Sequence, residues 1–213
     1  MQLSIIGTGR MGKGLIKTLA PYEKDVLWAS RDTERVQSLI SENNLQSIIP
    51  VSYDQALGAD IIIHSMWFRD LIPWAKENKG LLAGKILVDI ANPFTEDFSS
   101  FTLDWGTSAA EELQKTLPET KVVGAFKNTF FSVFEEPIHE GLRSDVYITS
   151  DDGNAKKVVM ELLRPIPFRI IDSGKLQNNR TIERMTLFER EIAIRYGSYP
   201  YVSNRLFGIN ELE

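Results

Sequence analysis

The chain has 213 residues, enough for one large domain, or one domain with an attached lobe, that folds without metals or disulfides. Its formal net charge of −5 and the lack of a basic run argue against nucleic acid and acidic membranes as partners. There is no cysteine and there are two histidines, which excludes disulfides, cysteine metal sites and thiol catalysis and disfavours a histidine-rich metal centre.

Strand-like runs alternate with helical patterns along the chain, an order that predicts a parallel sheet with crossover helices. We expect strands at residues 2–6, 25–29, 61–63, 86–88, 122–126, 146–149 and 168–171. We expect helices at residues 11–20, 32–42, 108–117, 152–164 and 176–196. The predicted fold class is α/β, a Rossmann-type, doubly wound, mostly parallel sheet with a small C-terminal strand–helix extension. Residues 1–126 would form the Rossmann domain, and residues 127–213 the extension, within one compact unit.

The last predicted helix has an apolar side. Its stripe at helical spacing consists of Ile182, Met185, Phe188 and Ile192. Its charged residues most simply form a solvated face: Glu183, Arg184, Glu189, Arg190 and Glu191. Alternatively, Ile182, Phe188 and Ile192 meet a second subunit.

A glycine-rich turn joins the first predicted strand to the first helix. Its sequence, Gly7-Thr8-Gly9-Arg10-Met11-Gly12, matches the dinucleotide fingerprint in the strand–turn–helix context that the fingerprint requires. Gly7 permits the tight turn, Gly9 lets a pyrophosphate approach the backbone, and Gly12 lets the helix pack closely on the strand. Free N–H groups at the helix N-terminus then bind phosphate. We therefore predict a dinucleotide site; a tight glycine turn without a ligand is the alternative.

The end of the second predicted strand distinguishes NAD from NADP. An NAD site places a carboxylate there, about 20 residues past the last glycine, for the ribose hydroxyls. This chain has Ser30 and Arg31, whose hydroxyl and guanidinium suit a 2′-phosphate, and Arg35 one helical turn further on offers a second charge. Asp32 is the competing carboxylate, but it is better placed as the N-cap of the next helix. The sequence favours NADP; a solvated helix start is the alternative for both arginines.

Three further motifs follow the glycine turn and Ser30-Arg31: Asp89-Ile90-Ala91-Asn92-Pro93, Ser108-Ala109-Ala110-Glu111 and Val122-Val123-Gly124-Ala125-Phe126. In this order and spacing they resemble the NADP-dependent reductases of the deazaflavin coenzyme, including their many dinucleotide-binding relatives. The similarity spans the chain, but its specific motifs end at residue 126. One departure concerns the second substrate: members usually read Ala-Phe-Asn-Thr after the sixth strand, whereas Lys127 intervenes here before Asn128 and Thr129.

The resemblance implies that NADP lies across the carboxyl ends of the strands. The implied cofactor contacts are Thr8, Arg10 and Met11 at the phosphates, Ser30 and Arg31 at the 2′-phosphate, Ser65, Met66 and Trp67 over the adenosine half, and Asn92 and Pro93 beside the nicotinamide. The second substrate would be a small planar electron acceptor such as a deazaflavin or flavin, near Phe126, Asn128 and Thr129. Residues 127–213 would complete its site, and a homodimer is a further implication.

Hydride transfer between a nicotinamide and a flavin-like ring needs orientation and a dry contact rather than a protein nucleophile. We therefore name no catalytic acid or base and no metal ligand. His64, at the end of a buried strand, is expected to be a hydrogen-bonded core residue; the alternative is a proton donor to an acceptor ring nitrogen. Asp89, at the end of the next strand, is expected to have a structural role, such as a bond to a neighbouring loop. The segment 94–105 is either a lid or an ordered surface loop. Aromatic side chains after the strands either stack on the acceptor or pack the loops: Trp67, Phe68, Phe94, Phe98, Phe101, Trp105, Phe130, Phe131 and Phe134.

The sequence thus predicts an NADP(H)-dependent oxidoreductase, and two other functions stay open. A sensor that binds NADP(H) without turnover is compatible with the lack of an evident acid or base. Imine and β-hydroxyacid reductases share the glycine turn but carry a long all-helical C-terminal domain, whereas two strand-like runs follow residue 127 here. No apolar run could span a bilayer and the first residues carry no basic leader, so we expect a cytoplasmic protein.

Overall fold

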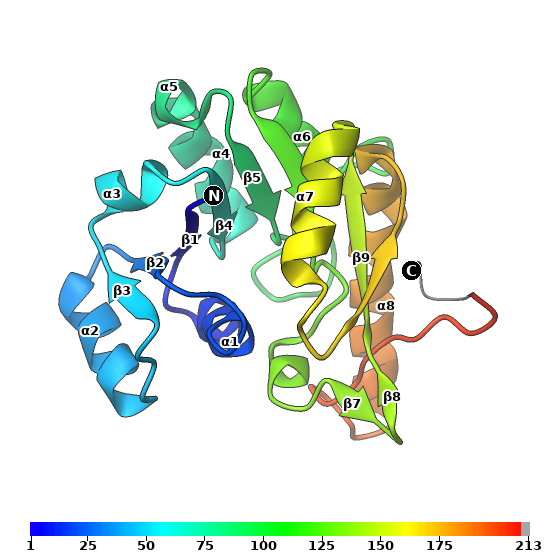
Figure 1. The fold of residues 1–213 in the computed structure, drawn as a ribbon. Helices are drawn as coiled ribbons and strands as arrows, with labels where there is room; N and C mark the ends of the chain where they lie inside the picture. The colour runs from blue at the N-terminus through cyan, green and yellow to red at the C-terminus, as the bar shows by residue number, and fades with distance from the viewer. Residues whose placement is uncertain (210–213) are drawn as a thin grey trace.

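The structure, a computed structural model, describes residues 1–209. Figure 1 shows a central sheet surrounded by helices. Within the described residues, eight strands pair in the order β10-β9-β6-β5-β4-β1-β2-β3, and β7 and β8 form a separate hairpin. The strands are β1 (Leu3–Ile6), β2 (Val26–Ala29), β3 (Ile48–Pro50), β4 (Ile61–His64), β5 (Ile86–Asp89), β6 (Lys121–Gly124), β7 (Ile138–His139), β8 (Leu142–Arg143), β9 (Asp145–Ser150) and β10 (Arg169–Asp172).

The helices connect these strands in the alternating order that the sequence predicts. They are α1 (Arg10–Leu19), α2 (Thr33–Glu42), α3 (Tyr53–Leu57), α4 (Phe68–Glu77), α5 (Lys79–Leu82), α6 (Ala109–Thr116), α7 (Gly153–Leu163) and α8 (Asn179–Arg195), with 3-10 turns η1 (Phe131–Phe134) and η2 (Leu176–Asn178). The order β3-β2-β1-β4-β5-β6 is that of a Rossmann sheet, and these strands are parallel. The predicted fold class is confirmed.

Two apolar cores, one on each face of the sheet, explain why the central strands are mostly apolar on both faces. One core takes buried side chains from α1, α2 and α7, and the other takes them from α3, α4 and α6. Every residue of β1, β4 and β5 is buried. Strands covered on both faces need continuous rather than alternating apolar residues, which is the pattern of residues 61–63 and 86–88.

The C-terminal part adds strands with a change of direction. The chain turns through η1 and the β7–β8 hairpin, so that β9 pairs antiparallel with β6, and β10 then pairs parallel with β9. Figure 1 shows α8, in orange, close to the yellow-green strand β9, and Asn179 Nδ2 of α8 donates to Thr149 Oγ1 of β9 (2.7 Å). The sheet is therefore mostly parallel, and the edge formed by β9 and β10 is the predicted strand–helix extension.

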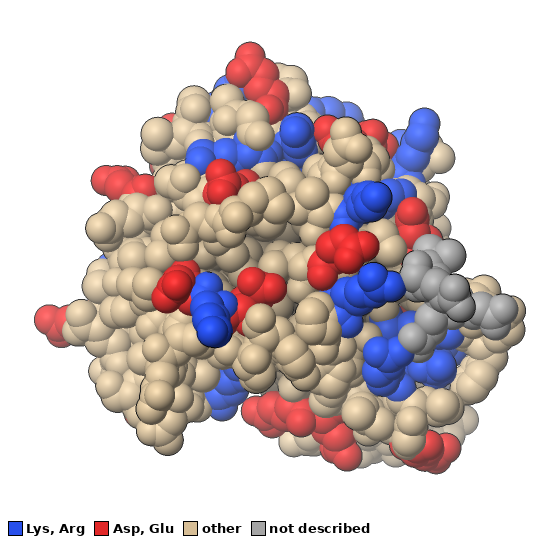
Figure 2. Space-filling model, in the orientation of Figure 1, with Lys and Arg blue, Asp and Glu red and all other residues tan. Residues whose placement is uncertain are grey.

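Several elements were not predicted, namely β3, α3, α4, α5 and the β7–β8 hairpin. β3 has three residues, one of them exposed, and α4 contains Pro73, which normally interrupts a helix. No helix in residues 1–209 is long and apolar enough to cross a membrane. Figure 2 shows one face of the molecule, on which Lys and Arg are interspersed with Asp and Glu between larger uncharged areas.

Candidate active site

The turn after β1 contains two glycines, Gly7 and Gly12, at which an added Cβ would clash with neighbouring atoms. Gly7 has φ +114°, and a Cβ on it would lie 2.2 Å from Ser65 Oγ. A Cβ on Gly12 would lie 2.2 Å from the Gly7 carbonyl oxygen. The Gly7 N–H donates to Ala29 O (2.8 Å) and the Gly7 carbonyl accepts from Trp28 Nε1 (2.9 Å), which fixes the turn against β2. The tight turn predicted at Gly7 and the close packing predicted at Gly12 are confirmed.

Gly9 differs from these two glycines because the protein itself does not require it. It has φ −69° and ψ −176°, an ordinary extended conformation, and a Cβ on it would meet no atom within 4 Å. Gly9 is also the N-cap of α1 and carries no side chain to cap the first N–H groups. The space next to Gly9 is open, and the fingerprint predicts that a dinucleotide pyrophosphate approaches the backbone there.

Arg31 follows the end of β2, is exposed to solvent, and directly precedes Asp32, the N-cap of α2. Asp32 caps α2 by accepting from the Arg35 N–H (2.9 Å), so its predicted role as N-cap is confirmed. The Ser30 hydroxyl donates to Asp32 O (2.6 Å), and a 2′-phosphate would have to exchange that hydrogen bond. Arg35 lies 3.6 Å from Glu42 on the helix surface. Burial raises the pKa of Tyr53, and the positive charge of Arg31 opposes that rise.

A cavity of about 460 Å³ opens where the central strands end. Its lining comes from both parts of the chain: the turn after β1, the segments after β4, β5 and β6, helix α8, and Tyr199. In a Rossmann sheet, ligands bind outside the carboxyl ends of the strands where the strand order reverses, which here lies between β1 and β4. The cavity occupies that position.

The cavity contains most of the predicted residues but not all of them. The predicted residues that line it are Gly9, Arg10, Met11, Ser65, Met66, Trp67, Asn92, Phe126 and Thr129. The predicted residues that do not line it are Gly7, Thr8, Gly12, Ser30, Arg31, Arg35, Pro93 and Asn128. Asn128 is 2% exposed and its Nδ2 donates to Asp145 O (2.8 Å), so it ties the loop to β9. The aromatic residues lining it are Trp67, Phe68, Phe94, Phe98, Phe126, Phe130, Phe131 and Tyr199.

Three buried polar atoms of cavity-lining residues have no hydrogen-bond partner within the described residues. They are Asn92 Oδ1, Thr129 Oγ1 and Arg190 Nε. A buried polar atom without a partner costs about 1–3 kcal/mol, which a ligand can recover. The set offers one acceptor, one hydroxyl and one cationic donor. Sequence reasoning missed Arg190, Thr186 and Tyr199, because no spacing relates these C-terminal residues to the glycine turn.

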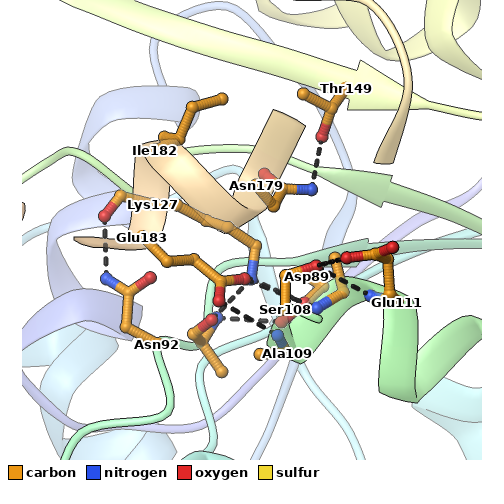
Figure 3. A network of polar contacts seen from close by, with 12 residues as sticks. Asp89, Asn92, Ser108, Ala109, Glu111, Lys127, Thr149, Asn179, Ile182 and Glu183 are labelled. Carbon is orange, nitrogen blue, oxygen red and sulfur yellow. Dashed lines mark hydrogen bonds and ion pairs between the residues drawn. The ribbon is translucent and has the colours of Figure 1, made fainter. Parts of the chain in front are cut away.

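A buried ionic network lies next to this cavity, and Figure 3 shows Lys127 between two carboxylates. Lys127 Nζ lies 2.7 Å from Asp89 Oδ2 and 2.9 Å from Glu183 Oε1, and it also donates to Ala91 O (2.5 Å). His64 Nε2 lies 3.0 Å from the other Asp89 oxygen. All four charged or titratable side chains are at most 1% exposed.

The charges of this network are set by mutual contact rather than by solvent. Burial alone would raise the pKa of Asp89, but Lys127 and His64 outweigh it and hold that pKa well below its usual range. Burial would lower the pKa of Lys127, but Asp89 and Glu183 raise it overall. Burial raises the pKa of Glu183, against Lys127 and the Ala109 N–H, which donates to it (3.0 Å). Lys127 is therefore charged. His64 and Asp89 are both buried in the core as predicted. Asp89 accepts hydrogen bonds from Lys127 and the Ala91 N–H, whereas the hydrogen bond predicted for His64 is not found among the described residues.

The network reaches the cavity through the backbone of Lys127. The Lys127 carbonyl accepts from Asn92 Nδ2 (2.8 Å), as Figure 3 shows, and from Thr186 Oγ1 (2.6 Å). Because a carbonyl can only accept, this contact fixes which end of the Asn92 amide is nitrogen. The Asn92 oxygen is therefore held free beside the cavity, where a carboxamide N–H of a nicotinamide would find an acceptor.

The predicted solvated face of α8 is wrong for most of its residues. Glu183 is fully buried, Arg184 donates to the carbonyls of Leu103 and Asp104, and Arg190 lines the cavity. Burial raises the pKa of Glu189 to about 7. Helical spacing identifies a face but not what packs on it, and here the N-terminus of α6 and the loop 94–105 cover it. Of the five residues, Glu191 is exposed and pairs with Arg195 (2.7 Å).

The segment 94–105 is an ordered loop in this structure. Phe94 and Phe101 form a β-bridge, and the Thr95 N–H donates to Ser100 O (2.9 Å). Arg184 also holds the loop against α8, since its guanidinium lies over the rings of Phe101 and Trp105. Of the two interpretations of this segment, a lid or an ordered surface loop, the structure shows the ordered loop.

A phosphate-binding turn that leads into an aromatic cavity at the switch point of a Rossmann sheet defines a dinucleotide-dependent oxidoreductase. The sequence model of the family described as NADP oxidoreductase, coenzyme F420-dependent, matches residues 2–93. The F420-dependent NADP reductase of Methanocaldococcus jannaschii is 30% identical, over 93% of this chain and 95% of the relative. The chain belongs to this family and is an NADP-dependent oxidoreductase, which confirms the resemblance inferred from the motifs.

Two further similarities span most of the chain. The F420-dependent NADP reductase of Methanothermobacter marburgensis is 28% identical, over 87% of this chain and 89% of the relative. A crystal structure from Arthrobacter sp. FB24, provisionally assigned as an F420-dependent NADP reductase, superposes with a TM-score of 0.81 at 24% identity, covering 93% of this chain and 96% of that one. The latter similarity establishes the fold, including the strands beyond β6.

Proposed function

We propose that this protein transfers hydride between NADPH and a planar ring acceptor of the deazaflavin or flavin class. The observation that carries the proposal is the aromatic cavity that begins at Gly9 and extends to Tyr199. A cavity of about 460 Å³ lies within the usual range for small-molecule sites. The names of the two archaeal relatives, F420-dependent NADP reductases, favour a deazaflavin as the acceptor.

Each part of the site has one task in this proposal. The N–H groups at the start of α1 bind the pyrophosphate, and the Arg31 guanidinium binds the 2′-phosphate. Asn92 Oδ1 accepts from the nicotinamide carboxamide and so orients the ring. NADPH, when bound, supplies the hydride with its electron pair. The aromatic lining excludes water and positions the acceptor ring, so the chain needs to provide no nucleophile.

The same proposal covers the organisation of the chain. Residues 1–126 bind NADP, and residues 127–213, of which 210–213 lie outside the described part, complete the acceptor site. Thr129, Thr186, Arg190 and Tyr199, which line the cavity, support this division. We also propose a homodimer in the cytoplasm, and the exposed Phe188 and Ile192 on α8 support a subunit contact there.

The test of the proposed function is turnover. NADPH oxidation is followed with deazaflavin, FMN, FAD, ferric chelates and quinones as separate acceptors. We expect the fastest turnover with a deazaflavin or flavin ring. Micromolar NADPH binding without turnover on any acceptor would instead favour a protein that senses NADP(H) redox state.

Replacing Arg31 with alanine is expected to weaken NADPH binding by about 1.5–3 kcal/mol, or about 10- to 150-fold in Kd. A charge-assisted hydrogen bond to the 2′-phosphate is lost, whereas NADH has no such phosphate, so its Kd should hardly change. Isothermal titration with both nucleotides at one ionic strength measures the difference. Arg164→Ala, which removes an exposed arginine that pairs with Glu161 at the end of α7, is the control and should change neither Kd. Equal losses for NADPH and NADH would contradict the 2′-phosphate assignment.

A further inference from the structure

Arg190 is a cationic side chain of the cavity to which the proposed function assigns no task. Its Nε is buried and has no hydrogen-bond partner among the described residues, and its Nη1 makes a long contact to Phe98 O (3.5 Å). Its guanidinium carbon lies 5.6 Å from the ring centre of Phe98 and 5.5 Å from that of Tyr199. No carboxylate of the described chain forms an ion pair with it. The guanidinium is thus a positive charge between two aromatic rings in a cavity lined mainly by aromatic and apolar side chains.

Arg190 as a whole is half-buried, but its Nε is not exposed. A buried N–H donor without a partner is unfavourable, and the two cation–π contacts do not supply an acceptor for it. By contrast, the neighbouring arginines of α8 are engaged by the protein, because Arg180 pairs with Glu111 and Arg184 binds three loop carbonyls. Arg190 therefore retains a donor for an oxygen or an anion that enters the cavity.

Hydride uptake by the proposed acceptor creates such an anion. The C4–H bond of the nicotinamide breaks with its electron pair, and a new C–H bond at a deazaflavin, or N–H bond at a flavin, forms on the acceptor ring. The neutral acceptor gains one negative charge, which is delocalised over the N1–C2 carbonyl edge of its pyrimidine ring until a proton arrives. A fixed cation near that edge stabilises the reduced ring and the transition state that leads to it.

We propose that Arg190 is a specificity-determining residue for the acceptor, and that its guanidinium selects rings that become anionic when they take up hydride. This inference rests on the proposed function. The proposal predicts that Arg190 does not raise kcat/KM for acceptors whose ring charge changes from positive to neutral when they take up hydride. Phenazine methosulfate is an acceptor of that second kind, whereas FMN and a deazaflavin are of the first.

The test compares Arg190→Met with wild type on both kinds of acceptor. We expect kcat/KM with FMN or a deazaflavin to fall about 10- to 100-fold, as for a lost charge-assisted hydrogen bond. With phenazine methosulfate, kcat/KM should stay the same or rise, and Arg190→Lys should recover part of the loss. Arg195→Met, which removes an exposed arginine of the same helix, is the matched control and should leave every rate unchanged. Equal falls on both kinds of acceptor, or no fall, would overturn the proposal.

A binding measurement separates this proposal from the proposed function. In anaerobic titrations, wild type should bind reduced FMN more tightly than oxidised FMN, and Arg190→Met should abolish that preference. The Kd for NADPH should not change; a loss of NADPH affinity as large as the loss for FMN would assign the guanidinium to the cofactor and overturn the proposal. If wild type turns over no ring acceptor, the proposed function fails, and the reduced-FMN titration still decides the role of Arg190.

Discussion

Gly9→Val is expected to abolish the binding of both NADPH and NADH while the fold stays intact. The valine side chain would fill the space in which the pyrophosphate approaches the backbone. The protein itself tolerates a Cβ at this position, since no atom lies within 4 Å of it and the backbone is ordinary extended chain. We expect a loss of more than about 3 kcal/mol for each nucleotide, over about 100-fold in Kd. Isothermal titration, with thermal unfolding of the same sample, measures binding and stability together.

Gly12→Val is the control that distinguishes a ligand-binding glycine from a structural one. Its Cβ would lie 2.2 Å from the Gly7 carbonyl oxygen, so the turn has to move and the variant should lose stability as well as binding. Gly9→Ala should fall between wild type and Gly9→Val in nucleotide affinity. If Gly9→Val retains NADPH affinity within about tenfold of wild type, the pyrophosphate does not lie at this turn.

Lys127→Met should lower the free energy of unfolding by about 3–5 kcal/mol, the usual result of removing one partner from a buried ion pair. Asp89 and Glu183 would then share a dry site without the cation that lies 2.7 Å and 2.9 Å from them. Urea unfolding at pH 7 measures the loss. Lys115→Met, at a lysine whose side chain is 65% exposed, should change stability by less than about 1 kcal/mol.

The pH dependence of the same variant gives an independent check. In wild type, Asp89 has a folded pKa below its unfolded value, so it contributes stability above about pH 4 that is lost as the pH falls. In Lys127→Met the unpaired carboxylates take up protons more readily. The difference in free energy of unfolding between wild type and variant should therefore shrink as the pH falls from 7 to 5. Adding Glu183→Gln should also restore part of the loss. If the difference in free energy of unfolding stays constant across this pH range, Lys127 does not stabilise the protein through its charge.

Much of the cofactor site could be predicted from the sequence because its determinants are local. The glycine turn, the end of β2 and the N-cap of α2 each depend on residues within a few positions of one another. Gly7, Gly12 and Asp32 do in the structure what their spacing indicates. The alternation of strands and helices is equally accessible from the apolar and helical patterns, apart from the three-residue strand β3.

The acceptor side could not be predicted in the same way, because distant segments build it. Lys127 looked like an insertion into a substrate motif, but it closes a network with Asp89, which is 38 positions away, and with Glu183 on α8. Helical periodicity alone assigned Glu183 and Arg190 to a solvated face. Only the packing of α8 against α6 and the cavity shows that one is buried and that the other faces a ligand site.

The most direct measurement is a titration of the wild-type protein with NADPH and with NADH at the same ionic strength. The structure predicts that NADPH binds at least about tenfold more tightly, because its 2′-phosphate meets the Arg31 guanidinium at the end of β2. Equal affinities, tighter binding of NADH, or no binding of either nucleotide would contradict a cofactor site at this edge of the sheet.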